Sequence, residues 1–173
     1  MNPQINQYGK GDNIAGDKVA GNKIATQINH SARQNPIVST PATNLFISYA
    51  VKDGSTAAQR LRAELTSAGF NVWRDVESMQ GGKEWKKQLR KAIKEVDAVV
   101  LLLSPAAVES RNVEWEWETA ETIETPILPV VVVPCEVPNE LDHLHRRDLS
   151  NADTYASNLA AIVGDLRKIR DNS

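Results

Sequence analysis

Cysteines, long apolar runs and excess charge are all scarce in this sequence of 173 residues. Cys135 is the only cysteine, which excludes an internal disulfide framework and is consistent with a reducing cytosol. The longest apolar runs, Ala98–Leu103 and Ile127–Val133, are much shorter than the roughly 20 residues that cross a bilayer. The N-terminus is polar and has no apolar signal-peptide core. We therefore expect a cytoplasmic protein with no membrane partner.

The formal charge of -2 gives no indication of nucleic-acid binding, which usually requires a basic surface. His30, His143 and His145 are too scattered to suggest a metal site, so no metal or resident cofactor is expected. The single thiol of Cys135 follows an apolar strand-like run and fits a small buried hydrophobe better than a nucleophile. Composition therefore points to a soluble globular protein and to no charged partner.

A repeat with a period of five residues opens the chain, in the units Gly11–Ala15, Gly16–Ala20 and Gly21–Ala25. Its regular Ile/Val positions favour stacking on copies from other chains, as in cross-β assemblies, because one such unit is too small to bury its apolar stripe. A flexible Gly/Asn-rich tail is the alternative interpretation. The repeat loosely resembles the amyloid signalling motifs that precede effector domains in multicellular bacteria.

Changes in composition along the chain predict three segments. Residues 1–30 form the repeat segment, a possible self-assembly motif, and residues 31–43, with Pro36 and Pro41, form a linker. Residues 44–170 are long enough for one domain with a full core.

Strand-like and helix-like segments alternate from Asn44 onward with short connections, which is typical of a parallel α/β sheet. Gly69 stands where a left-handed helix cap is needed. The periodicity predicts strands at Leu45–Tyr49, Phe70–Trp73, Ala98–Leu103 and Ile127–Val133. It predicts helices around Ala58–Ala68, Trp85–Val96, Val113–Ile123 and Tyr155–Ile169, and it predicts no more than a short helix and loops for Cys135–Asp153.

Four motifs in a fixed order carry a family resemblance. They are Phe46–Tyr49, Gly69–Glu77 running to Gly81-Gly82, Leu101–Pro105, and Val113–Glu116 with Ala120. Together they resemble a TIR (Toll/interleukin-1 receptor) domain over about residues 44–170. The resemblance implies a flavodoxin-like fold of five parallel strands flanked by helices. It also implies a mobile loop at about Arg74–Gly82, for which the glycine pair is the most plausible hinge.

The resemblance leaves two functions open. Some TIR domains are scaffolds that assemble through the mobile loop, and others, including many bacterial ones, hydrolyse NAD. A glutamate in the helix after the third strand separates the two kinds, and Glu116 stands at the matching position. The enzymatic reading predicts an effector in bacterial immune or cell-death signalling that uses NAD as a substrate.

Cleavage of NAD at the nicotinamide ribosyl bond develops positive charge on the ribose. A fixed carboxylate stabilises that charge most strongly in the transition state. Glu114, Glu116 and Glu118 alternate along one predicted helix, where positions two apart point about 200° apart. All three cannot face one crevice, so we expect Glu114 and Glu118 to face solvent and the family register to select Glu116.

The resemblance also assigns NAD-binding positions to Ser48, Tyr49, Ala50, Trp73 and Asp75. Trp73 offers a stacking surface, and a core role for it is equally consistent with the sequence. Some relatives carry basic residues at the positions of Ala50 and Val51, so a diphosphate would instead meet backbone amides around Asp53–Ser55. Helix capping by Asp53 or Ser55 is the alternative role for that segment.

One departure from the family pattern favours the scaffold reading. Enzymatic relatives often carry a tryptophan one turn before the glutamate, and this chain has Asn112 there.

In enzymatic relatives a neighbouring molecule's loop completes the active site. We therefore expect a homo-oligomer or filament formed through the TIR domain and the repeat, with an upstream sensor carrying a similar motif as a possible partner.

A phosphoacceptor receiver domain has the same layered fold but needs acidic residues at the ends of the first and third strands. Here those places hold Ser48-Tyr49 and Leu103-Ser104, which disfavours this function.

Overall fold

The computed structural model describes residues 42–73 and 83–171, with side chains in the second range described from residue 86. The repeat, most of the linker, Asp75 and the pair Gly81-Gly82 lie outside these residues. Within the described ranges, no helix combines the length and the hydropathy needed to cross a bilayer.

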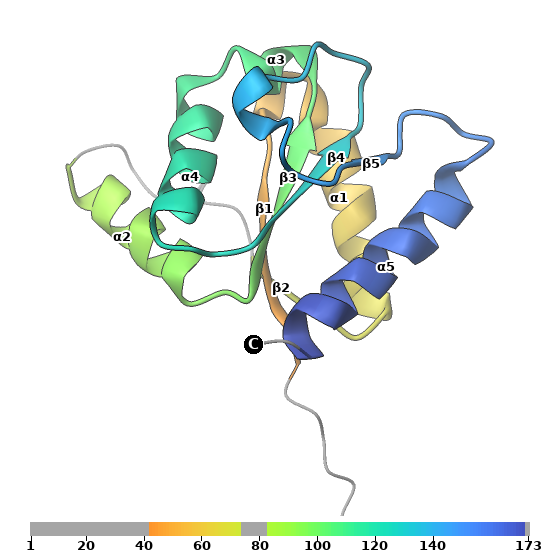
Figure 1. Cartoon of the computed structure of the whole chain (residues 1–173), viewed down its shortest axis with the longest axis horizontal. Coiled ribbons are helices and arrows are strands. Elements are labelled where there is room, and N and C mark those ends of the chain that lie inside the picture. The colour runs from red at the N-terminus through yellow and green to blue at the C-terminus, as the bar shows by residue number, and fades with distance from the viewer. Residues whose placement is uncertain (1–41, 74–82, 172–173) are drawn as a thin grey trace, which may run out of the picture. The chain divides into compact units, whose positions relative to one another are not determined.

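A five-stranded parallel sheet forms the centre of the described domain, in the order β2-β1-β3-β4-β5 (Figure 1). Its strands are β1 (Asn44–Ser48), β2 (Asn71–Trp73), β3 (Ala98–Leu103), β4 (Ile127–Val131) and β5 (Arg147–Asp148). This order confirms the flavodoxin-like fold class. The chain changes direction across the sheet between β1 and β3, and ligands of such folds bind outside the carboxyl ends of the strands at this point.

Helices cover both faces of the sheet (Figure 1). They are α1 (Val51–Ser67), α2 (Lys83–Lys94), α3 (Pro105–Val108), α4 (Arg111–Thr122), the short 3-10 helix η2 (Asn139–Leu141) and α5 (Tyr155–Asp171). The first and last helices, α1 and α5, pack on one face, and α2 and α4 pack on the other. Right-handed crossovers place the connections before and after β2 on opposite faces in this way.

Alternating side chains in the strands supply the apolar cores on the two faces of the sheet. In β1, Leu45 and Ile47 pack toward α1 and α5, whereas Phe46 packs toward α2. All six side chains of β3 are buried, because this strand has neighbours on both edges and helices on both faces. The unbroken apolar run of β3 follows from that central position.

The predictions for one strand and one helix cap are confirmed, and two other strands differ in their bounds. The third strand has the predicted bounds, and Gly69 has a φ of 94°, the left-handed conformation that glycine adopts without strain. The first strand begins and ends one residue earlier than predicted, and the fourth ends at Val131.

The sequence periodicity did not predict two of the observed elements, α3 and β5. The helix α3 is a single turn with Pro105 at its first position and Ser104 as its cap, a signal that was present in the sequence. The strand β5 is only two polar residues long and pairs with Val130 and Val131. It carries no apolar alternation, so pattern reasoning had nothing to detect.

Tyr155 anchors the start of α5 to α1. Its hydroxyl donates a hydrogen bond of 2.6 Å to Glu64, and the Arg60 guanidinium carbon lies 3.6 Å from the centre of its ring. Burial raises the pKa of Tyr155 to about 12, the hydrogen bond and the charge of Glu64 add to this rise, and Arg60 opposes it. The phenol therefore stays protonated in the folded protein at a pH where an unfolded tyrosine ionises.

We expect the stabilising contribution of Tyr155 to be complete below about pH 10 and to be lost as the pH rises toward 12. Tyr155→Phe should therefore lower the free energy of unfolding near neutral pH, and the difference from the wild type should shrink over this alkaline window. Urea unfolding of both proteins from about pH 8 to about pH 12 measures the difference. A difference that stays constant with pH would contradict the prediction.

Candidate functional site

A hydrogen bond joins the end of β1 to the middle of α4. The hydroxyl of Ser48 donates to Oε2 of Glu116 over 2.5 Å, across 68 residues of sequence. Ser48 is buried, and Glu116 is 9% exposed. A carboxylate is thus held almost out of water beside the carboxyl end of β1, at the point where the strand order reverses.

Burial distinguishes the three alternating glutamates of α4 from one another. Glu116 is buried, whereas Glu114 and Glu118 are exposed, as the helix geometry and the family register together predicted. The helix is held in register by Val113, Trp117 and Ala120, which are buried at spacings of four and three residues. Glu116 lies on the flank of this apolar stripe that faces β1.

The start of α4 is also fixed locally. Ser110 is its cap residue, and its hydroxyl accepts a hydrogen bond of 3.4 Å from the amide of Val113. Arg111 and Asn112 are exposed, so Asn112 is not part of the buried contact around Glu116. The position where enzymatic relatives often carry tryptophan therefore faces solvent in this chain.

Asp53 has a role that sequence reasoning missed. Its carboxylate accepts hydrogen bonds from the hydroxyl of Ser104 at 2.6 Å and from the amide of Ala106 at 2.9 Å. It therefore ties the first turn of α1 to the first turn of α3, at the ends of β1 and β3. In the sequence, the Ser104-Pro105 pair indicates the start of a helix at this point. Only the fold shows that Asp53, 51 residues earlier, is the hydrogen-bond partner of Ser104.

The segment Asp53–Ser55, for which phosphate binding or helix capping was predicted, lies inside the first turns of α1. The helix α1 begins at Val51, and no side chain caps it, so capping by Asp53 or Ser55 is wrong. The amide of Gly54 donates to the carbonyl of Ala50 inside the helix, and the Ser55 hydroxyl donates to the carbonyl of Val51. Because the Gly54 amide is used in this way, it is not free to meet a diphosphate. Binding of a diphosphate by the other backbone amides around Asp53–Ser55 stays a prediction.

Tyr49 and Trp73 lie together on the other side of the strand ends. Both line a small pocket of about 50 Å³ beside α1, with Arg62 at its border. Trp73 is 43% exposed, which rules out the core role and leaves its ring accessible for stacking. Glu116 does not line this pocket, so the structure brings Ser48 to Glu116 and Tyr49 to Trp73 as two separate pairs.

Ala50 is buried in the cluster that contains Leu101, Leu103 and Trp117, so its side chain serves the core. Val51, the next residue, is 59% exposed at the start of α1. Asp75, the remaining predicted contact to NAD, lies outside the described residues.

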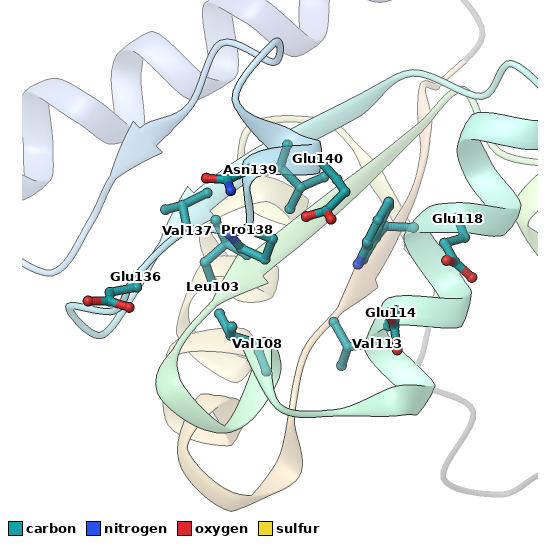
Figure 2. Close-up of a pocket in the computed structure, with 13 residues that line it drawn as sticks. Leu103, Val108, Val113, Glu114, Glu118, Glu136, Val137, Pro138, Asn139 and Glu140 are labelled. Carbon is teal, nitrogen blue, oxygen red and sulfur yellow. The ribbon is translucent and has the colours of Figure 1, made fainter.

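A larger pocket lies on the other flank of α4. It has a volume of about 480 Å³ and is lined by α3, α4 and residues 136–141, with Leu103 at the end of β3. Figure 2 shows Glu114 and Glu118 on the α4 side and Glu136, Asn139 and Glu140 across from them. Glu116 is not among the lining residues, so this pocket is distinct from the Ser48–Glu116 pair.

Cys135 is partly buried against the cluster that contains Trp117. Burial raises the pKa of the Cys135 thiol, and the charge of Asp53 adds to this rise. The thiol is therefore protonated at neutral pH, which disfavours a nucleophilic role. In residues 42–73 and 83–171 there is no group of three His, Cys, Asp or Glu side chains that could hold a metal ion.

Comparisons with known proteins agree with this architecture. The family model described as "TIR domain" matches residues 45–163. The TIR domain of the Toll-related receptor TRR-2 from Hydra magnipapillata is 22% identical with a TM-score of 0.60, and the match covers 71% of this chain and 97% of that one. No curated protein matches the chain.

Two further solved structures share the fold. The TIR domains of the activated Roq1 resistosome, which recognises the pathogen effector XopQ, are 18% identical with a TM-score of 0.55, covering 72% of this chain and 99% of that one. The Clostridium botulinum CMP N-glycosidase BcmB is 16% identical with a TM-score of 0.54, covering 69% of this chain and 99% of that one.

Proposed function

Because the chain belongs to the TIR-domain family, we propose that it is an effector that cleaves NAD to nicotinamide and ADP-ribose or a cyclic form of it. The observation that supports this most directly is the Ser48–Glu116 pair. It presents one nearly buried carboxylate at the position that the resemblance assigns to catalysis. Glu114 and Glu118 are exposed and offer no such preorganised group.

The bond to nicotinamide is already activated, because the cationic ring leaves as a neutral base. The remaining demand is to stabilise the oxocarbenium-like ribose, and glycosidases meet the same demand with carboxylates. Glu116 performs this role while water, or an internal adenine nitrogen, attacks the ribose carbon. The Ser48 hydroxyl orients the carboxylate, and low exposure strengthens its attraction for the developing cation.

The nicotinamide end of the substrate stacks on the accessible ring of Trp73, which lines a pocket with Tyr49. The pocket at Tyr49 and Trp73 has only about 50 Å³, far less than the few hundred Å³ typical of ligand sites. We expect a neighbouring copy to complete the substrate site, as the resemblance to enzymatic TIR domains implies. One similar structure, the CMP N-glycosidase, shows that this fold also houses a protein named for cleaving an N-glycosidic bond.

In this proposal, NAD cleavage is controlled by the assembly of several copies of the chain. The repeat brings copies together, an upstream sensor carrying a similar motif acts as the trigger, and NAD loss is the output in bacterial immune or cell-death signalling. One similar TIR structure belongs to an activated resistosome, an assembled state that recognises a pathogen effector.

The direct test is to incubate concentrated full-length protein with NAD and to separate the products by chromatography. Free nicotinamide and an equal amount of ADP-ribose, linear or cyclic, are expected. No release at concentrations where the protein is assembled would overturn the enzymatic proposal.

A second candidate function is a TIR scaffold that assembles without catalysis. Asn112 favours it, because an exposed polar residue stands where enzymatic relatives often place tryptophan. Self-association without nicotinamide release is the result that would select this function.

A further inference from the structure

The exposed side of α2 carries a stripe of basic side chains. Lys87, Arg90, Lys91 and Lys94 are exposed and follow the spacing of one helix face, opposite the buried Leu89. Lys91 pairs with Glu95 at 3.7 Å. Lys87, Arg90 and Lys94 form no ion pair with any residue that the structure describes. We call these four residues the basic stripe.

The 480 Å³ pocket beside α4 has the opposite charge. Its floor is apolar and includes the buried side chains of Leu103, Val113, Trp117 and Leu141. Its rim carries Glu114, Glu118, Glu136 and Glu140, which are all exposed. None of these four carboxylates pairs with a basic residue of the described ranges. We call this feature the acidic pocket.

The basic stripe and the acidic pocket adjoin on one face of the domain. Both α2 and α4 cover the same side of the sheet, and Arg90 and Glu118 line a small pocket of about 170 Å³ between them. One half of this face therefore carries three cations, and the other half four carboxylates, that form no ion pair within the part of the chain that the structure describes. Such a face is complementary to itself when a second copy is turned by 180° about an axis in the face.

We propose that this face is a dimer interface in which the basic stripe of each copy lies on the acidic pocket of the other. The long lysine and arginine side chains cover the apolar floor with their methylene groups and bring their charges to the glutamates on the rim. Both contacts form at once, because residue i meets residue j and j meets i in a two-fold interface. The proposal does not rest on NAD cleavage, and its test measures association alone.

Charge reversal tests the pairing in the full-length chain. One variant carries Lys87→Glu, Arg90→Glu and Lys94→Glu, and a second carries Glu114→Lys, Glu118→Lys and Glu140→Lys. In either variant alone, like charges face each other across the interface. Sedimentation velocity should then show a dissociation constant raised at least about tenfold, because opposed like charges disfavour association. A mixture of the two variants restores opposite charges at both contacts and should restore association.

A control variant carries Lys52→Glu, Arg167→Glu and Lys168→Glu, which changes the net charge equally at exposed positions outside the proposed interface. It should associate like the wild type. Association should also weaken with salt, because the Debye length falls from about 10 Å at 0.1 M to about 3 Å at 1 M. If both interface variants associate as the wild type does, or if their mixture shows no recovery, the proposal is wrong.

Zero-length cross-linking separates this interface from any contact made by the repeat. Amine-to-carboxylate coupling in an equal mixture of isotopically light and heavy protein should join Lys87 or Lys94 of one copy to Glu114, Glu118 or Glu140 of the other. The absence of mixed-isotope peptides between these segments, while the protein is associated, would overturn the proposal.

Discussion

Glu116→Gln is expected to lower the rate of NAD cleavage by about 100-fold or more. The amide keeps the shape of the side chain and an oxygen that accepts the hydrogen bond from Ser48, but it removes the negative charge. The substitution therefore destabilises the transition state, in which the ribose is cationic, more than it weakens the binding of NAD. Nicotinamide release measured at matched protein concentration should show a reduced kcat with a smaller change in KM.

A buried carboxylate bonded to Ser48 also serves the fold, so folding must be measured alongside activity. Thermal unfolding of Glu116→Gln should stay within several degrees of the wild type, because one hydrogen bond is kept. Glu109→Gln is the matched control, since Glu109 is exposed at the end of α3 and contacts neither Ser48 nor Glu116 in any described hydrogen bond. Near wild-type turnover in Glu116→Gln would exclude the proposed role of this residue.

Deletion of residues 1–28 is expected to lower specific activity in dilute solution by on the order of 100-fold while sparing it in concentrated solution. A short flexible linker holds attached domains at an effective concentration that can reach millimolar. Copies joined through the repeat would therefore find each other at concentrations where free domains do not. Nicotinamide release across a dilution series of both proteins gives the comparison.

A full-length variant with Ile14→Asp, Val19→Asp and Ile24→Asp provides the control for chain length. These three apolar residues stand at the fourth position of the three repeat units. The variant keeps the length of the chain but places charge where the repeat is expected to stack, so it should behave like the deletion. Dilute activity that is unchanged by the deletion would show that the repeat does not drive assembly.

The sequence was informative wherever the pattern reports the local surroundings of a residue. The uninterrupted apolar run of β3 predicted a strand with its correct bounds, and Gly69 predicted a left-handed cap. The helical angle between alternate positions, together with the family register that selects Glu116, predicted that Glu114 and Glu118 face solvent. The same reasoning could not locate β5, because two polar residues become a strand only when Val130 and Val131 are beside them.

Contacts between distant segments were decided by the tertiary structure. Ser48 and Glu116 are 68 residues apart, and Asp53 and Ser104 are 51 residues apart, so no local spacing relates them. The sequence by itself determined the parallel α/β class, the principal strands and helices, and the family register that selects Glu116. Only the packing of α4 against the end of β1 determined that this carboxylate is buried and held by a serine, because burial and hydrogen bonding depend on which chain segments meet.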